Sequence, residues 1–126
     1  YARRQQALCA RDRLGNKPFY YHWTGNRIYI ASEMHSLLEL PDVPQRLNEG
    51  MVAEFLAAHW VSTSETFWAD ISRLPAAHQL ICDRDGLRAE KYWSPDLHAR
   101  LPYTTEEQFI EHYADLLTRT VRRMCR

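Results

Sequence analysis

The chain of 126 residues is long enough for one domain with a core, and its 16 basic and 16 acidic residues cancel to a formal net charge of zero. That balance argues against nucleic acid as a partner, and no apolar run approaches the length of a membrane span. Cys9, Cys82 and Cys125 are odd in number and widely spaced, which argues against a disulfide framework and favours a reducing compartment, the cytoplasm. Because the chain starts at Tyr1 rather than at a methionine, we expect an internal segment of a longer protein.

Stretches rich in aromatic and β-branched residues predict the strands of a half-buried antiparallel sheet. These strands are expected at Gln5–Arg11, Phe19–Trp23, Arg27–Ala31, His78–Arg84 and Leu87–Trp93. The middle of the first strand, including Leu8 and Cys9, is expected to be buried. Gly25 can supply the positive φ of a type II′ turn, which predicts a hairpin between the second and third strands. Asp85-Gly86 is typical of a type I′ turn and predicts a second hairpin.

Two short helices are predicted between these hairpins. Ser32 is the expected N-cap of a helix over Glu33–Leu40, with Glu33 favourable in its first turn. Asn48 is the expected N-cap of a second helix, which runs from Glu49 to about Trp60. The residues expected to face inward from the second helix are Val52, Phe55, Leu56 and His59.

The C-terminal part of the chain carries the clearest helix pattern. Residues 96–103 have no periodicity and predict a linker. A capping box at Thr104-Thr105-Glu106-Glu107 then predicts the start of a helix that continues to Arg126. Its apolar stripe consists of Phe109, Tyr113, Leu116, Leu117, Val121 and Met124.

Several sequence blocks, in order and at plausible spacing, resemble the glutamine-hydrolysing asparagine synthetase family. The blocks are RDRLGNKPFYY (11–21), IASE (30–33), LN with EFL (47–48 and 54–56), TFWADI with RLP and His78 (66–78), and YWSP (92–95). The residues in these motifs that we take as structural candidates are Arg11, Asp12, Gly15, Lys17, Pro18, Ser32 and Glu33. Arg11 and Asp12 are interpreted as turn anchors rather than as catalytic groups, because clustered charges are usually paired.

The resemblance implies an α+β fold. Residues 1–95 would be the C-terminal half of a class II, N-terminal-nucleophile glutamine amidotransferase domain with an antiparallel sheet. Residues 96–126 would be a linker and the first helix of the synthetase domain. Family members hydrolyse glutamine with an N-terminal cysteine and pass the ammonia to a carboxylate, usually that of aspartate, activated by ATP with Mg²⁺. The expected partners are therefore glutamine, a carboxylate acceptor and the preceding and following parts of the same protein, with no membrane or nucleic acid; a homodimer stays open.

Neither catalytic centre of the family is found in this sequence. No cysteine is N-terminal, and the four glycines are too isolated to form a phosphate loop, so we assign no catalytic or substrate-binding residue here. The six histidines are scattered without metal-ligand spacing, so no metal site is expected. The segment alone is expected to be inactive.

Three departures from the family pattern leave the product open. Asp70 stands where glycine is usual, Ala76-Ala77 replaces Pro-Gly, and His35 replaces a common lysine. Related enzymes close β-lactam rings, cyclise lasso peptides or amidate sugars, and each is an alternative to an asparagine synthetase. A non-catalytic interaction module that keeps the scaffold is a further alternative.

Overall fold

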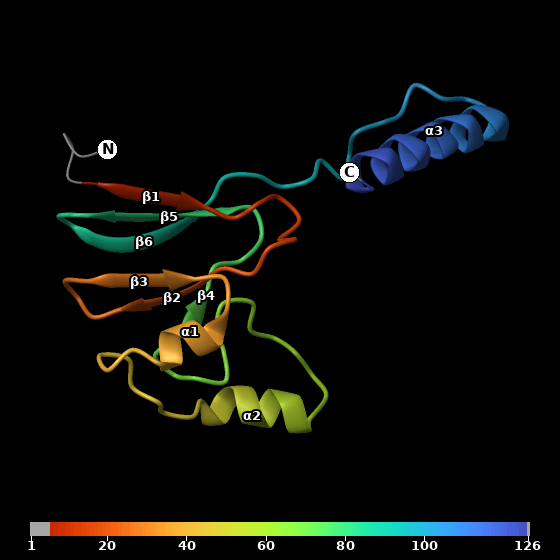
Figure 1. The fold of residues 1–126 in the computed structure, drawn as a ribbon. Helices are drawn as coiled ribbons and strands as arrows, with labels where there is room; N and C mark the ends of the chain where they lie inside the picture. The colour runs from red at the N-terminus through yellow and green to blue at the C-terminus, as the bar shows by residue number, and fades with distance from the viewer. Residues whose placement is uncertain (1–5, 126) are drawn as a thin grey trace. The chain divides into compact units, whose positions relative to one another are not determined.

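The computed structural model describes residues 6–125 and has an α+β fold (Figure 1). Its contacts divide the chain into two units, of which one ends at Ser94 and the other begins at Pro95. The first unit contains two small antiparallel sheets and two short helices, and the second contains one long helix. Each unit is described by itself.

The first sheet has the strand order β1-β5-β6, with β1 at Ala7–Ala10, β5 at His78–Asp83 and β6 at Gly86–Lys91. Leu8 lies opposite Ile81 in this sheet. Leu80 and Ile81 of the central strand are buried, because β5 is covered by a neighbour on each side. On the edge strand Leu8 is half exposed, so the expected burial of the middle of β1 is wrong for the described residues, and Gln5 lies outside them.

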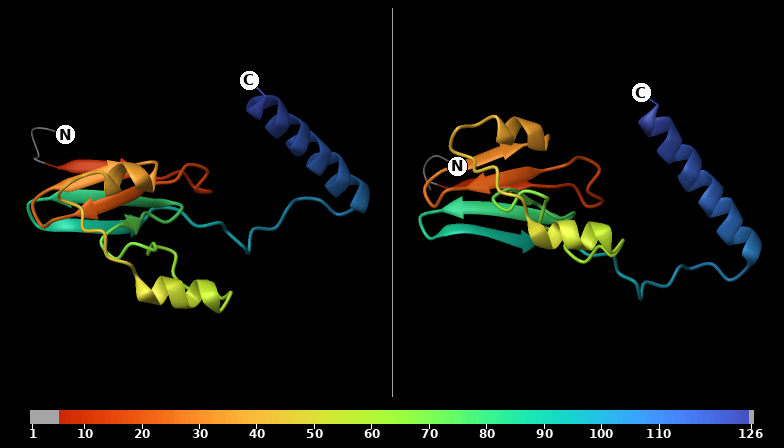
Figure 2. Two further views of the ribbon diagram at one scale, coloured as in Figure 1. Left: turned by 60° about the horizontal axis from the view of Figure 1, so that its bottom comes forward. Right: turned by 90° about the horizontal axis from the view of Figure 1, so that it is seen from below.

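The second sheet has the order β3-β2-β4, with β2 at Tyr20–Trp23, β3 at Ile28–Ala31 and β4 at Ser72–Arg73. It lies next to the first sheet in all the views (Figure 2). The two-residue strand β4 pairs with Tyr20 and Tyr21 and was not predicted, because the polar dipeptide Ser72-Arg73 has no alternating pattern of its own.

The two predicted hairpins are present, but one turn differs from the prediction. Gly25 has φ +94° in the β2–β3 turn, as a type II′ turn requires at its first central position. In the β5–β6 hairpin Asp83 pairs with Gly86, so the central residues are Arg84 and Asp85 rather than Asp85 and Gly86. Of the residues in this turn, Gly86 has a positive φ, at +122°, whereas a type I′ turn needs positive φ at both central positions.

The helices of the first unit lie beside the second sheet (Figure 1). Helix α1, Met34–Leu38, contacts β3 and β2 and buries Leu37 in a cluster with Val43 and Ile71. Glu33, not Ser32, is its N-cap, and no side chain caps the helix. The predictions that Ser32 caps this helix and that Glu33 lies in its first turn are therefore wrong, since Glu33 has the extended backbone of an N-cap, with φ −122° and ψ 129°.

Helix α2, Glu49–Leu56, starts as predicted and ends one turn early. Asn48 accepts a hydrogen bond from the backbone N–H of Met51, and Met51 is the residue that the helix buries. The helix ends because Ala58 adopts φ +49° and the backbone closes a Schellman motif, in which the N–H of His59 donates to Glu54. Phe55 and Leu56 are consequently exposed, by 56% and 78%, instead of facing inward.

The second unit contains the residues after Ser94, with helix α3 at Glu106–Met124 (Figure 1). Its capping box lies one residue later than predicted, because Thr105 is the N-cap and pairs reciprocally with Gln108. The predicted apolar stripe is exposed along the helix, and α3 buries no residue. Within residues 6–125, no helix has both the length and the apolar character needed to span a membrane.

Candidate functional site

Arg11 is the centre of the turn that the sequence motif marks. Its guanidinium donates three hydrogen bonds to backbone carbonyl oxygens, from Nε to Lys17 at 2.8 Å, from Nη2 to Gly15 at 2.9 Å and from Nη1 to Leu74 at 2.6 Å. The first two acceptors lie within the turn, and the third lies directly before Pro75 on a segment 63 residues away in sequence. A planar fork with several fixed donors can join these carbonyls, which a lysine ammonium on its flexible stem could not do in the same geometry.

Asp12 stabilises the same turn through hydrogen bonds to its backbone. Its carboxylate accepts hydrogen bonds from the backbone N–H groups of Leu14 at 3.1 Å, Asn16 at 3.0 Å and Lys17 at 3.3 Å. These donors, the N–H of Asn16 above all, keep the pKa of Asp12 below its usual value although partial burial acts against them. The carboxylate is therefore ionised and fixed by the backbone around it.

Gly15 is required by both the backbone and the space around it. Its φ is +69°, and a Cβ there would lie 3.1 Å from Arg11 Nη2 and 3.1 Å from the Cβ of Ala76. Lys17 contributes its backbone N–H and carbonyl to the network, and its side chain is exposed. Pro18 fixes φ after the turn and leads into β2.

The turn is fastened to the end of the β5–β6 hairpin. Tyr92 donates its hydroxyl to the carbonyl of Arg11 at 2.7 Å, and the N–H of Ala77 donates to the carbonyl of Asp12 at 3.0 Å. The guanidinium of Arg13 lies over the ring of Trp93, 5.4 Å from its centroid. Five of the seven predicted residues are thus brought together at one junction, whereas Ser32 and Glu33 lie elsewhere, between β3 and α1.

Asp70, which stands where the sequence pattern usually has glycine, forms an ion pair with an arginine of this chain. Its carboxylate forms a two-pronged pair with Arg46, with Nε and Nη2 each 2.9 Å from a carboxylate oxygen. The arginine lowers the pKa of Asp70 below its usual value against the opposing effect of burial. The buried ring of His22 hydrogen-bonds through Nδ1 to the carbonyl of Asp70 at 2.5 Å, and because a carbonyl only accepts, Nδ1 carries the proton. Asp70 therefore anchors its loop to β2 and to the segment before α2.

The other two departures have structural consequences as well. Ala77, where the family has glycine, is buried at φ +59°, a conformation that costs a residue with a Cβ about 1 kcal/mol. His35 lies on α1 with Nε2 3.2 Å from the Glu39 carboxylate, an exposed i,i+4 contact.

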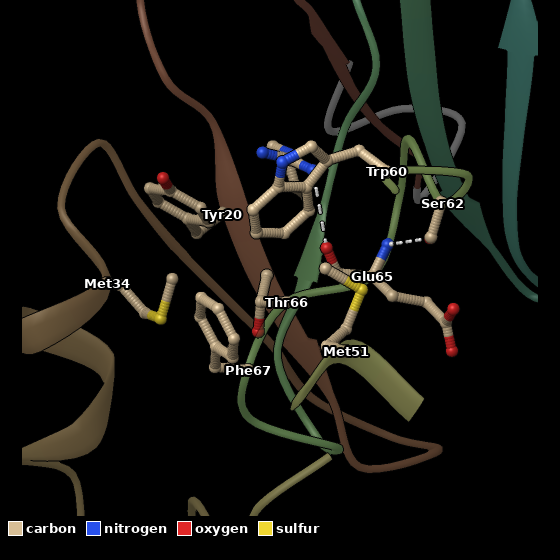
Figure 3. A pocket seen from close by; sticks show the side chains of 9 residues that line it. Tyr20, Met34, Met51, Trp60, Ser62, Glu65, Thr66 and Phe67 are labelled. Atoms are coloured by element: carbon tan, nitrogen blue, oxygen red, sulfur yellow. Dashed lines mark hydrogen bonds between the residues drawn. The ribbon is translucent and has the colours of Figure 1, made fainter. Parts of the chain in front are cut away.

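A pocket of about 430 Å³ lies between α1, α2 and β4 (Figure 3). Its apolar wall consists of Tyr20, Met34, Met51, Trp60 and Phe67. The polar residues of its lining are Ser62, Glu65, Thr66 and Arg73. Arg73 donates to the backbone carbonyls of Thr63 and Glu65. The nine lining residues include neither cysteine nor histidine, so the pocket offers shape and an apolar surface rather than an activated nucleophile.

Comparison with known protein families identifies the first unit. A sequence model described as a glutamine amidotransferase domain matches residues 1–93, which is more than half of the chain. The chain belongs to the glutamine amidotransferase domain family. The matched residues contain both the anchored turn at Arg11 and Asp12 and the pocket of Figure 3.

Curated relatives of this amidotransferase chain are much longer proteins. A protein of Methanocaldococcus jannaschii assigned as glutamine-hydrolysing asparagine synthetase 2 is 30% identical over 117 residues, which cover 91% of this chain and 23% of the relative. Glutamine-hydrolysing asparagine synthetase 3 of Bacillus subtilis is 32% identical over 93 residues, 73% of this chain and 15% of its own length. A Gibberella zeae protein named amidase chry2 is 32% identical over 124 residues, 94% of this chain and 18% of its own length. The chain thus spans less than a quarter of each of these relatives.

Sequence reasoning missed the residues that hold the amidotransferase turn from outside and those that form the pocket. Leu74 and Tyr92 lie 63 and 81 residues from Arg11, and no local spacing connects them. The pocket combines residues from five separate segments, and only two of them, at Tyr20 and at Thr66–Arg73, carried a motif. Within residues 6–125, no group of three or more His, Cys, Asp or Glu side chains could hold a metal ion.

Proposed function

We propose that this chain is the C-terminal half of a class II, N-terminal-nucleophile glutamine amidotransferase domain, followed by a linker and the first helix of an ATP-dependent synthetase domain. The whole protein would be a ligase that forms an amide from a carboxylate and ammonia released from glutamine. The match of residues 1–93 to the amidotransferase family is the observation that carries this proposal.

The second unit adds support for the synthetase part. The alignment with the M. jannaschii relative covers 117 residues, more than the 93 that the amidotransferase family accounts for, so it extends into the second unit. The relative is named a glutamine-hydrolysing asparagine synthetase, and its similarity therefore includes residues beyond the amidotransferase match. An amphipathic helix with an exposed apolar stripe fits the start of a further domain, because such a stripe is normally buried against a neighbour.

In this proposal the residues of this chain hold the scaffold. Arg11 and Asp12 fix the turn that joins the two sheets, and the Arg46–Asp70 pair fixes the loop before β4. The nucleophilic cysteine and the glutamine-binding residues would lie before Tyr1. The ammonia would pass to the acceptor outside this chain.

The residues of this chain do not suit a binding site for ATP and Mg²⁺. Gly15, Gly25, Gly50 and Gly86 are each separated by ten or more residues, so they cannot form a loop whose backbone N–H groups surround a phosphate chain. The described residues also offer no group of metal ligands. We therefore assign the nucleotide and the metal to the synthetase part of the full-length protein.

The acceptor is most simply aspartate, as the names of two relatives indicate. A second candidate is the different amide-forming reaction of a related cyclase or sugar amidotransferase; a relative that matches 94% of this chain is named an amidase, so not all relatives are named asparagine synthetases. The test is to offer ATP and glutamine with aspartate or with other carboxylic acids and to identify the amide by mass spectrometry.

Glutamine hydrolysis tests whether the catalytic centre lies outside this chain. The full-length protein is expected to release glutamate from glutamine, whereas a purified chain of residues 1–126 is expected to release none because it lacks the nucleophile. Glutamate release by the 126-residue chain would refute the assignment of the catalytic centre to residues before Tyr1.

A further inference from the structure

A second hollow in the first unit has a different chemical character from the pocket of Figure 3. It is a groove of about 520 Å³ at the junction of the two sheets. Its polar lining is made of Arg11, Ser62, Thr63, Arg73, His78 and Lys91. Arg73 belongs to the β3-β2-β4 sheet, whereas His78 and Lys91 face each other at the ends of β5 and β6 in the other sheet.

The groove concentrates positive charge in a chain whose net charge is zero. Its lining residues include the permanent cations Arg11, Arg73 and Lys91 and no carboxylate. Ion pairs of arginine among the described residues instead involve Arg27, Arg46, Arg88 and Arg119. The positive potential of the groove is therefore not neutralised by the residues that line it.

Donors remain available at the groove. In the part of the chain that the structure describes, the side-chain hydrogen bonds of Arg73 use Nε and Nη2, which leaves the two protons of Nη1. The hydroxyl oxygen of Ser62 accepts from the N–H of Glu65, so its own proton is free to donate. The exposed ammonium of Lys91 carries three donors. The nitrogens of Arg11 are bound to backbone carbonyls, so Arg11 contributes charge rather than donors.

We propose that this groove binds a tetrahedral oxyanion, the phosphate group of inorganic phosphate or of a small phosphate ester. Cationic and hydroxyl donors from three segments can bind several oxygens of such a group at once, and both arginine and lysine bind phosphate. The bound anion connects Arg73 of one sheet with Lys91 of the other and stabilises the junction that Arg11 already holds.

The two lysines of the chain make the test internally controlled. Lys91 lines the groove and Lys17 does not, although both side chains are exposed. The full-length protein is treated with a limiting amount of an amine-acylating N-hydroxysuccinimide ester, with and without inorganic phosphate or glycerol phosphate, at ionic strength matched by sodium chloride. Acylation of each lysine is followed by peptide mass spectrometry.

Phosphate at ten times its dissociation constant is expected to slow acylation of Lys91 about tenfold by mass action and to leave Lys17 unchanged. Stronger protection by glycerol phosphate than by inorganic phosphate would assign the ligand to an ester, and the reverse to the free anion. The Arg73→Gln variant is expected to lose the protection while a cooperative urea-denaturation transition shows that it stays folded. Equal rates at Lys91 with phosphate and with chloride, or unchanged protection in Arg73→Gln, would overturn the proposal.

Discussion

Arg11 is the residue on which the local structure depends most, because one guanidinium bonds three backbone carbonyls in two segments. An Arg11→Lys variant keeps the charge and loses the planar arrangement of donors. We expect it to lower the free energy of unfolding by about 2 kcal/mol, since hydrogen bonds from a charged group contribute about 1.5–3 kcal/mol each and the lysine can remake some of them. Urea denaturation followed by tryptophan fluorescence measures this change.

Arg27→Lys is the matched control for that substitution. Arg27 is exposed, and a lysine can keep its surface ion pair with Asp42, so the free energy of unfolding should change by less than about 0.5 kcal/mol. Equal stability of the Arg11→Lys and Arg27→Lys variants would contradict the anchoring role of Arg11.

Asp70 makes stability depend on pH through its pair with Arg46. The folded chain lowers the pKa of Asp70, so the pair contributes stability above the unfolded pKa of about 3.9 and loses it as the pH falls through the lower folded pKa. Asp70→Asn should therefore cost about 1 kcal/mol at neutral pH, the upper range for a pair whose arginine is exposed. The cost should shrink as the pH falls through the folded pKa of Asp70, because the native carboxyl then takes up its proton.

Denaturation of both proteins at neutral and acidic pH measures this difference. A cost that is the same at both pH values would show that the Arg46–Asp70 ion pair is not its source.

At the scale of elements, helix α2 shows where backbone conformation overrides a sequence pattern. The apolar spacing continues to Trp60, but the helix ends at Leu56 because Ala58 takes the left-handed conformation that glycine usually provides. Ala58 is exposed and has no packing to lose. Ala58→Gly is expected to raise the free energy of unfolding by about 0.5–1 kcal/mol, as measured by thermal or urea denaturation.

Ala57→Gly provides the control for that substitution. Ala57 is the C-cap at φ −77°, where glycine relieves no strain and only adds flexibility to the unfolded chain. It should be neutral or destabilising, and an equal gain from both variants would contradict a strained end of α2.

The strands and helices were predictable where the signal was local. Gly25 and Asn48 act where the sequence places them, because each bonds or bends the backbone within three residues. The predictions for Ser32 and Asp85 failed because their neighbours fixed the backbone differently: Glu33 has the extended backbone of the N-cap, and pairing of Asp83 with Gly86 sets the turn. The motif pointed to Arg11, but its partner Leu74 and the two hollows depend on tertiary contacts that no spacing reveals.

At the scale of the whole molecule, the apolar stripe of α3 leads to a prediction about the full-length protein. The helix buries no residue in this chain, and most of the stability of a helix in a protein comes from packing of its apolar face. We expect its amides to exchange rapidly in the 126-residue chain and to be strongly protected in the full-length protein, where the proposed synthetase domain would cover the stripe. Amides of the central strand β5 should be protected in both and serve as the reference. Rapid exchange of α3 in both proteins would argue against its place in a further domain.

The proposed ligase, of which this amidotransferase chain is a part, moves the amide nitrogen of glutamine to a carboxylate. To test this, the full-length protein is supplied with glutamine labelled with ¹⁵N in its amide, with ATP, Mg²⁺ and a panel of carboxylic acids that includes aspartate. We expect ATP cleavage together with a new amide that contains the ¹⁵N label. Glutamine that stays intact, with ATP uncleaved for every acceptor, would contradict it and favour a scaffold that has no ligase chemistry.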